Sequence, residues 1–170
     1  MLDFPETAVV LAAHGAPATD CPKRRVGLLV ALEMSNTRLR PLVRLRERLE
    51  REIRDWPRTP ANDPYKAAVD TLAAALSDRL RCPVVAGYNE FCNPTIAQAL
   101  DRAVAAGARR VIVIPTMLLR GNEHTEAEIR GAVDSAPSRH PGVTFRYAFP
   151  FPLEALLDLY ARQVTDHLAG

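Results

Sequence analysis

The sequence has almost no excess of charge of either sign, which excludes one class of partner at once. Its 170 residues include 22 Lys and Arg against 20 Asp and Glu, a net charge of +2. The basic residues are nearly all arginine and are spread along the chain, whereas a nucleic-acid-binding domain gathers them into one patch. We therefore expect no nucleic-acid partner.

Long apolar runs are also missing. The uncharged stretch VGLLVAL at Val26–Leu32 falls far short of the roughly 20 residues that are needed to cross a bilayer. The N-terminal MLDFPETAVVLAAHG carries acids where a signal peptide has a basic region, and its apolar run leads into His-Gly instead of a cleavage site. The sequence predicts no membrane association and a cytoplasmic location.

Paired cysteines and the common nucleotide motifs are absent as well. Cys21, Cys82 and Cys92 are odd in number and match no zinc-ribbon spacing, so we expect free thiols. The sequence contains no P-loop, no GxGxxG after a strand, no GxSxG and no HExxH, which removes the usual signals of nucleotide binding, serine hydrolysis and zincin-type proteolysis. We expect no nucleotide cofactor.

What the sequence does contain is a repeated alternation of strand and helix patterns. Four short, apolar, β-branched segments are predicted strands: Thr7–Ala13, Cys82–Tyr88, Arg109–Pro115 and Val143–Phe149. Helix-length segments separate them, and LEALLDLYARQVTDHL closes the chain as a final amphipathic helix. This order predicts an α/β fold, with a four-stranded parallel sheet flanked by helices on both faces.

Local signals in the first half predict where the helices begin and end. The region from Gly27 to about Trp56 is interrupted by Pro41, so it should form two helical pieces. Asp63-Pro64 has the N-cap and first-turn residues of a helix that should run to about Leu80. The loops at 17–26 and 57–63 are expected to be the flexible stretches.

Similar signals recur in the second half. Asn93-Pro94 repeats the helix-start pattern before TIAQALDRAVAA, and Gly107 should end that helix. Thr125 and Glu128 form a capping-box pattern directly after a histidine, for a helix that should end near Ser135.

Residues able to carry chemistry collect where three predicted strands end. Ligands of open parallel sheets bind at the carboxyl ends of the strands. The first strand leads into His14, the second into Glu90 and Cys92, and the third into His124. Imidazole with carboxylate suits divalent first-row metals, and a neutral imidazole is also a suitable general base. Ordinary interpretations remain open: His14 as a turn residue, Glu90 as a solvated acid and Cys92 as an inert thiol.

These residues belong to segments that resemble a known family. VVLAAHG at Val9–Gly15 and YNEFCNPTIAQALDRAVAAGARRVIVIPTMLLRGNEHTEAEI at Tyr88–Ile129 are similar to the small CbiX-type sirohydrochlorin cobaltochelatases, within the class II tetrapyrrole chelatases. The shared features are His-Gly after the first strand, Glu four residues before a Pro, the GARRVIVIP strand and the pattern G-x-x-H-x-x-x-E-I.

The resemblance implies a flavodoxin-like chelatase domain over residues 1–170, with an extended helical insertion at about 16–63. It implies insertion of a divalent metal, cobalt first, into sirohydrochlorin or a similar carboxylate-rich tetrapyrrole without ATP. The residues that it brings over form two sets: His14, His124 and Glu90 as catalytic and metal-binding groups, and Arg120, Gly121 and Gly15 as groups that bind the macrocycle.

Two questions stay open at this point, the identity of the metal and whether the protein catalyses its insertion. The metal could be Fe²⁺ or Ni²⁺ instead of Co²⁺, because selectivity depends on geometry and availability. A carrier that binds tetrapyrrole or metal without turnover would show the same residues. Larger class II chelatases have two such domains facing one another across a cleft, so the resemblance also implies a homodimer.

Overall fold

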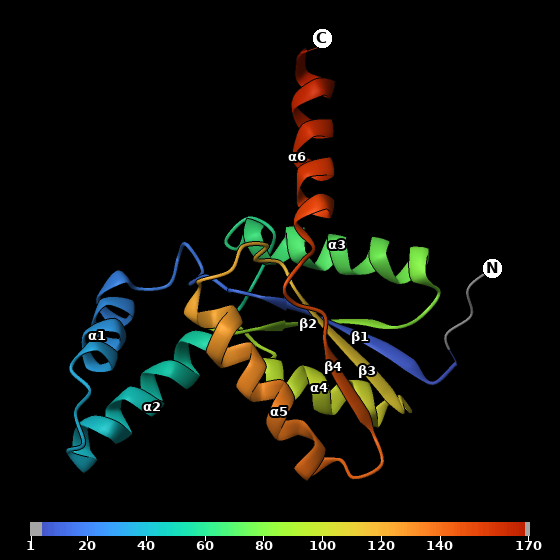
Figure 1. Cartoon of the computed structure of the whole chain (residues 1–170). Helices are drawn as coiled ribbons and strands as arrows, with labels where there is room; N and C mark the ends of the chain where they lie inside the picture. The colour runs from blue at the N-terminus through green and yellow to red at the C-terminus, as the bar shows by residue number, and fades with distance from the viewer. Residues whose placement is uncertain (1–4, 169–170) are drawn as a thin grey trace.

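A four-stranded parallel sheet forms the centre of the computed structural model, which describes residues 5–168 (Figure 1). Its strands, in the order β2-β1-β3-β4, are β1 (Thr7–Ala13), β2 (Val84–Tyr88), β3 (Arg110–Pro115) and β4 (Thr144–Tyr147). All seven residues of the central strand β1 are buried. The α/β fold and its four strands are therefore as predicted, with β2, β3 and β4 each shorter than expected.

Helices cover both faces of this sheet. The helical segments of the described chain are α1 (Lys23–Met34), α2 (Arg40–Arg54), α3 (Pro64–Leu80), α4 (Ile96–Ala105), the π-helical turn η1 (His124–Glu128), α5 (Ile129–Arg139) and α6 (Leu153–Leu168), of which α3, α4 and α5 pack on the sheet. Val10 and Val113 pack with α4 and α5 on one face, whereas Leu11 and Ala13 pack with α3 on the other. This division follows from the alternation of side chains along each strand.

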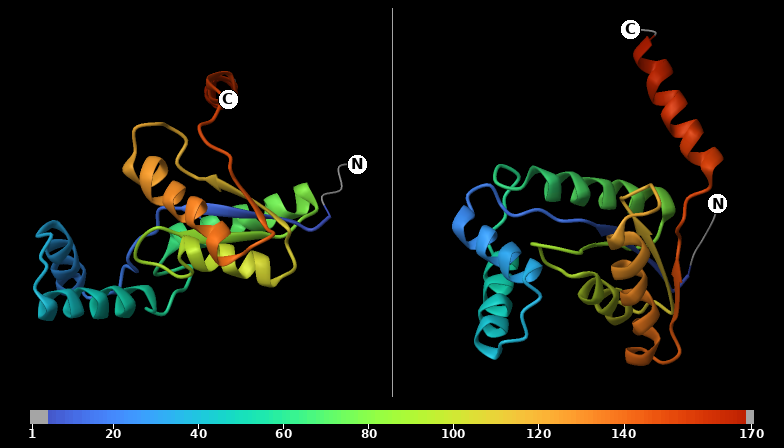
Figure 2. Two further views of the ribbon diagram at one scale, coloured as in Figure 1. Left: turned by 60° about the horizontal axis from the view of Figure 1, so that its bottom comes forward. Right: turned by 60° about the vertical axis from the view of Figure 1, so that its left-hand side comes forward.

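The helices α1 and α2 pack against each other as a hairpin with a small apolar core of its own. That core contains Leu29 and Leu32 of α1, Leu49 and Ile53 of α2, and Phe91 from the loop after β2. The hairpin lies beyond the carboxyl end of the sheet, as the two views of Figure 2 agree. The two predicted helical pieces are thus present, and Pro41 stands in the first turn of α2.

Helix ends follow the sequence signals in some places and not in others. Asp63 caps α3 as predicted, since its side chain accepts a hydrogen bond from the Lys66 backbone N–H at 2.8 Å. The helix start at Asn93-Pro94 was predicted two residues early. Thr95 is the N-cap of α4, because its hydroxyl and the Gln98 side chain form a reciprocal capping box.

The predicted capping box of Thr125 and Glu128 is wrong. Asn122 caps this turn instead: its side-chain oxygen accepts from the His124 backbone N–H at 2.8 Å, and its carbonyl accepts from the Thr125 hydroxyl at 3.0 Å. The predicted helix end near Ser135 is also wrong, because α5 continues to Arg139 with Pro137 inside it.

The expectations about membrane-spanning segments and about the cysteines can both be compared with the described residues. None of the helices within residues 5–168 combines the length and apolar character that a membrane crossing requires. Cys21, Cys82 and Cys92 are all buried free thiols, as predicted.

Candidate metal centre

His14 and Glu90 are brought together by the sheet itself. The pairing of β1 with β2 continues beyond the strands, since the Asn89 backbone N–H donates to the Ala13 carbonyl at 3.0 Å and the Glu90 N–H to the His14 carbonyl at 2.8 Å. The His14 Nε2 atom lies 3.8 Å from a Glu90 carboxylate oxygen. Two residues 76 positions apart in sequence therefore share one loop pair at the strand ends.

Gly15 makes this close approach sterically feasible. Its φ of +94° lies in the region that favours glycine, and a Cβ at this position would stand 2.0 Å from the Glu90 carbonyl oxygen. The structure thus gives Gly15 a packing role between the two loops, in addition to the macrocycle contact that the resemblance implies.

His124 enters the same space from the first position of η1. Its ring centroid lies 4.5 Å from that of His14, in an edge-to-face arrangement at 83°. One potential ligand atom from each of His14, Glu90 and His124 can be chosen so that all three lie within 4.8 Å of one another. Two atoms bound to one metal at about 2.1 Å cannot be more than about 4.2 Å apart, so binding needs only a small closure. We call these three residues the His–Glu–His cluster.

Hydrogen bonds fix how each imidazole is presented. The Nδ1 of His14 lies 2.7 Å from the Gly15 carbonyl oxygen, which can only accept, so Nδ1 carries the proton. The Nδ1 of His124 lies 2.6 Å from a Glu128 carboxylate oxygen and donates in the same way. In a neutral imidazole bonded in this way Nε2 is the unprotonated acceptor, the form that binds a metal or takes up a proton.

Glu128 is a functional candidate that sequence reasoning missed. It was assigned to a capping box, whereas it serves as the hydrogen-bond partner of His124 one helical turn away. The spacing of four residues from His124 was a usable signal, because side chains at i and i+4 meet on a helix.

The cluster lies beside an acidic cleft of about 690 Å³. Its lining includes five glutamates, contributed by α1, α2, the loop after β2, the residue before η1 and the end of η1: Glu33, Glu50, Glu90, Glu123 and Glu128. Burial, and then the charges of Glu90 and Glu50, raise the pKa of Glu33 above its ordinary value. This electrostatic environment favours the approach of a cation.

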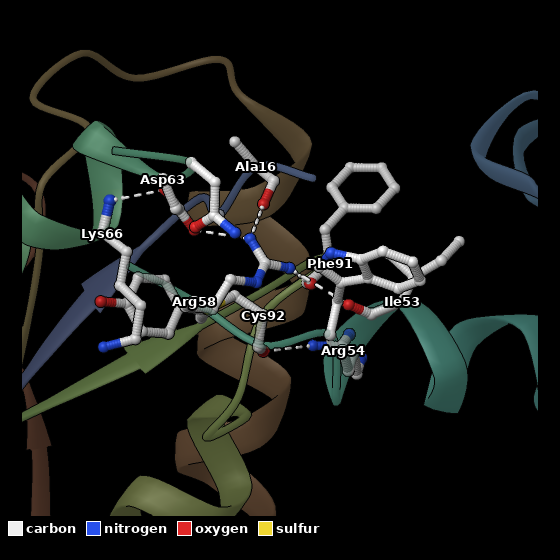
Figure 3. Close-up of polar contacts among 12 residues, drawn as sticks. Ala16, Ile53, Arg54, Arg58, Asp63, Lys66, Phe91 and Cys92 are labelled. Carbon is white, nitrogen blue, oxygen red and sulfur yellow. Dashed lines mark hydrogen bonds and ion pairs between the residues drawn. The ribbon is translucent and has the colours of Figure 1, made fainter. Parts of the chain in front are cut away.

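Two arginines connect the α1–α2 hairpin to the loops of the site (Figure 3). Arg54 is the last residue of α2, and Arg58 lies in the 57–63 loop, which was predicted to be flexible. The Arg58 guanidinium pairs with buried Asp63 at 2.5 Å and donates to the carbonyls of Ala16 and Phe91. With Arg58 9% and Asp63 2% exposed in their side chains, this part of the 57–63 loop is well packed rather than loosely held.

Arg54 extends the same connection along the loop that carries Glu90. It donates to the Asn89 carbonyl at 2.6 Å and to the Cys92 carbonyl at 2.9 Å. Together Arg54 and Arg58 therefore hold the backbone on both sides of Glu90, while Arg58 also holds the loop that follows His14.

Arg120 and Gly121 do not line the acidic cleft. Arg120 is 71% exposed in its side chain and makes a loose pair with Glu126 at 3.5 Å. Both residues line a different hollow, between the Thr116–Asn122 loop and Tyr160 of α6. Gly121 has a φ of +83° and open space around its Cβ position.

Comparison with known proteins matches the sequence to a family. The sequence model of the CbiX family matches residues 61–166, which include Glu90 and His124. The chain belongs to the CbiX family. The predicted resemblance is thereby confirmed, although His14 lies before the matched segment.

Individual relatives of this CbiX-family chain are similar over parts of their length. A sirohydrochlorin cobaltochelatase of Priestia megaterium is 43% identical over 63 residues, which cover 37% of this chain and 20% of that protein. A ferrochelatase of Stenotrophomonas maltophilia is 29% identical over 157 residues, covering 85% of this chain and 48% of its own length. The chain thus spans less than half of the length of these curated relatives.

A solved structure supports the fold assignment. A CbiX protein from Marinobacter aquaeolei VT8 superposes with a TM-score of 0.56 at 17% sequence identity, covering 96% of this chain and 97% of that one. At this identity the likeness bears on the fold alone.

Proposed function

We propose that this chain inserts a divalent metal ion, cobalt first, into sirohydrochlorin or a similar carboxylate-rich tetrapyrrole without ATP. The observation that carries the proposal is the convergence of His14, Glu90 and His124 beside an acidic cleft, with both imidazole Nε2 atoms free. Membership in the CbiX family and the names of the relatives support the choice of reaction class.

The proposed chemistry requires bases as well as ligands. Two pyrrole N–H protons must leave the macrocycle as the metal enters, and a base that is neutral near pH 7 is suited to accept them. His14 and His124 are assigned this role, each through Nε2. Glu128 holds the His124 proton on Nδ1 and would stabilise the imidazolium that forms.

Glu90 is assigned to the metal ion. Its carboxylate would replace part of the hydration shell of the incoming cation and present it beside His14. Glu33 and Glu50, on the hairpin wall of the cleft, would raise the local concentration of cations. The metal is a substrate in this scheme, and it leaves bound in the product.

The carboxylates of the tetrapyrrole need positive partners outside this acidic cleft. Arg120 is assigned to them, together with Lys23, Arg24 and Arg25 at the start of α1, because a guanidinium binds carboxylate through paired charge-assisted hydrogen bonds. Gly121 would let the backbone of its loop approach the ring. The reacting ring would thus lie between the acidic cleft and these basic side chains.

We further propose that residues 1–170 act as one chelatase domain in the cytoplasm, without a nucleotide, and that the insertion at 16–63 belongs to the site. The resemblance implied that a partner copy encloses the macrocycle. In this chain the hairpin supplies Glu33, Met34, Glu50 and Arg54 to the cleft lining, so part of that enclosure is built in. A homodimer, which the resemblance implies, is retained as part of this proposal.

Anaerobic mixing of the purified protein with sirohydrochlorin and Co²⁺, Fe²⁺ or Ni²⁺ tests the proposal. Absorption of the macrocycle should change faster than in a protein-free control, and fastest with cobalt. Faster insertion of iron or nickel would reassign the metal. Tight binding of the macrocycle with metal insertion at the uncatalysed rate would show that the protein is a carrier and not an enzyme.

A further inference from the structure

Glu90 belongs to a tight turn, Asn89–Cys92, whose backbone needs support from outside. Phe91 has a φ of +54°, in the left-handed region that disfavours residues with a side chain. The Cys92 backbone N–H donates to the Glu90 carbonyl, only two residues earlier, at 2.6 Å. A non-glycine residue persists in such a conformation where the surrounding structure holds it, and such residues gather at functional sites. The contacts of this turn therefore decide how Glu90 is presented to His14.

The α1–α2 hairpin and the loop after it supply these contacts. The Phe91 side chain packs against the apolar core of the hairpin, and Arg58 donates to the Phe91 carbonyl. The two terminal nitrogens of Arg54 donate to the carbonyls of Asn89, at 2.6 Å, and Cys92, at 2.9 Å (Figure 3). Three of the four carbonyls of the turn are thus bound by an arginine, and the fourth accepts from within the turn.

Arg54 has an electrostatically unfavourable place for a site that receives cations. Among the described residues that line the acidic cleft it is the only basic one, and its side chain is 12% exposed. A fixed positive charge opposes the approach of a metal ion, so Arg54 does not contribute to the attraction of cations into the cleft. Its position is explained by the backbone that it holds.

Glu50 fixes the orientation of the Arg54 guanidinium. Its carboxylate lies one turn earlier on α2 and accepts a hydrogen bond from the Arg54 Nε at 3.0 Å. The planar guanidinium has its nitrogens in a rigid fork, so this bond directs the other two nitrogens toward the turn. Since Glu50 and Arg54 are on the same helix, the position of α2 is transmitted to the backbone on both sides of Glu90.

We propose that Arg54 is a positioning residue for metal binding: it holds the Asn89–Cys92 turn so that the Glu90 carboxylate faces the two histidines, and Glu50 orients it for this task. The inference rests on the proposed function, since it takes the His–Glu–His cluster as the place where the metal ion binds. The insertion at 16–63 thereby becomes part of the metal centre, through Arg54, and not only a wall of the cleft.

Arg54→Met separates positioning from charge by the sign of its effect on Co²⁺ binding. Loss of charge alone would leave the cleft more negative, so Co²⁺ would bind more tightly. Loss of positioning should raise the Kd for Co²⁺ about 10-fold or more, as when partners that orient a metal ligand are removed, and should change the d–d absorption of the bound ion. Arg54→Lys should weaken binding as well, because an ammonium keeps the charge but lacks the fork. Arg51→Met, exposed on the same helix, is the control and should change neither quantity.

The turn can also be followed without a metal ion, through the buried thiol of Cys92. In a Cys21→Ala, Cys82→Ala background, Arg54→Met should speed the reaction of Cys92 with a chromogenic disulfide reagent by about 10-fold or more, because local opening of the turn exposes the thiol. In a Cys21→Ala, Cys92→Ala background the same substitution should leave the reaction of Cys82 unchanged, since Cys82 is buried before the amino end of β2. Equal acceleration at both thiols would show a general loss of stability and would overturn the positioning role.

Glu50→Gln completes the test, because Glu50 is inferred to act through Arg54. It should weaken Co²⁺ binding more in the parent protein than in Arg54→Met, since residues that share one contact have non-additive effects. Equal effects in the two backgrounds would show that Glu50 acts through its charge alone and would overturn its orienting role. A Co²⁺-binding parent whose affinity is unchanged or higher in Arg54→Met would overturn the positioning role of Arg54. A parent that binds no Co²⁺ would overturn the proposed function, and this inference with it.

Discussion

At the scale of single residues, the two histidines are expected to carry the proposed chemistry. Replacing either His14 or His124 by Ala should lower kcat by about 100-fold or more, the usual scale for losing a general base. Folding should survive, since the His14 and His124 side chains are 40% and 20% exposed at the strand ends. The measurement is insertion rate against pH, with circular dichroism as the control. Near-normal turnover in both variants would place the active site elsewhere.

Glu90 should behave differently because it is assigned to the cation. Glu90→Gln keeps the shape of the side chain and removes its charge, so the apparent KM for the metal should rise while macrocycle affinity stays the same. Metal titrations at fixed sirohydrochlorin measure the first quantity, and fluorescence quenching of the macrocycle measures the second. Equal weakening of both would show that Glu90 contributes to general binding instead.

Glu128 gives a test of the hydrogen bond behind His124. Since this carboxylate fixes the imidazole tautomer, Glu128→Gln should weaken Co²⁺ binding by about 10-fold or more, within the range seen when such partners are removed. Glu123→Gln is the matched control, because Glu123 lines the same cleft without a hydrogen bond to either histidine. The d–d absorption of bound Co²⁺ reports the affinity. Equal losses of Co²⁺ affinity in both variants would show that the effect comes from the negative charge of the cleft and not from the hydrogen bond to His124.

At the scale of helices and strands, the alternation of strand and helix patterns predicted the order of the elements correctly. The local signals for the helix caps were less reliable. β1 was predicted to the residue, because its apolar residues are bounded by turn signals on both sides. Asn93 and Thr95 are both good capping residues, and only the reach of Gln98 back to Thr95 selects the second. At the start of η1, Asn122 and Thr125 are likewise both good capping residues, and only the hydrogen bond from the His124 backbone N–H to the Asn122 side chain selects Asn122.

The members of the candidate site could be predicted from the sequence, but the contacts that hold the surrounding segments in place could not. Strands of one parallel sheet end at one edge, so His14, Glu90 and His124 could be grouped from sequence. The position of the α1–α2 hairpin depends on contacts between distant segments, such as Arg58 with the Phe91 carbonyl. No local pattern encodes such contacts, and the arginine-rich composition hid Arg58 among similar residues.

Arg58 is expected to couple the hairpin to the site. Arg58→Met would leave Asp63 buried without its partner, and breaking a buried pair in this way costs about 3–5 kcal/mol. It would also free the Ala16 and Phe91 carbonyls, so Co²⁺ affinity at the cluster should fall. Urea unfolding and cobalt titration measure the two effects. Arg51→Met, exposed near the end of α2, is the control and should change neither. Lower stability with unchanged cobalt affinity would make Arg58 a purely structural residue.

At the scale of the whole molecule, the acid side of the stability profile should depend on a contact that joins α4 to the end of α5. The His140 Nε2 lies 2.6 Å from an Asp101 carboxylate oxygen, and this hydrogen bond, aided by Arg139, holds the pKa of Asp101 below its ordinary value. A carboxyl whose pKa is lowered by folding stabilises the protein above its unfolded pKa of about 3.9. That contribution is lost as the pH falls through the lower, folded value.

The free energy of unfolding, measured with urea between about pH 6 and pH 2.5, should therefore decline below about pH 4, and Asp101→Asn should make the decline shallower. Near neutral pH this variant should be less stable than the parent, because it loses the charge that His140 and Arg139 contact. At the lowest pH, where Asp101 is protonated in both states, the two proteins should converge. Asp134→Asn, exposed on α5, is the control for removing a negative charge from this side of the molecule. Parallel profiles for the parent protein and Asp101→Asn would show that Asp101 does not link these helices to the pH response.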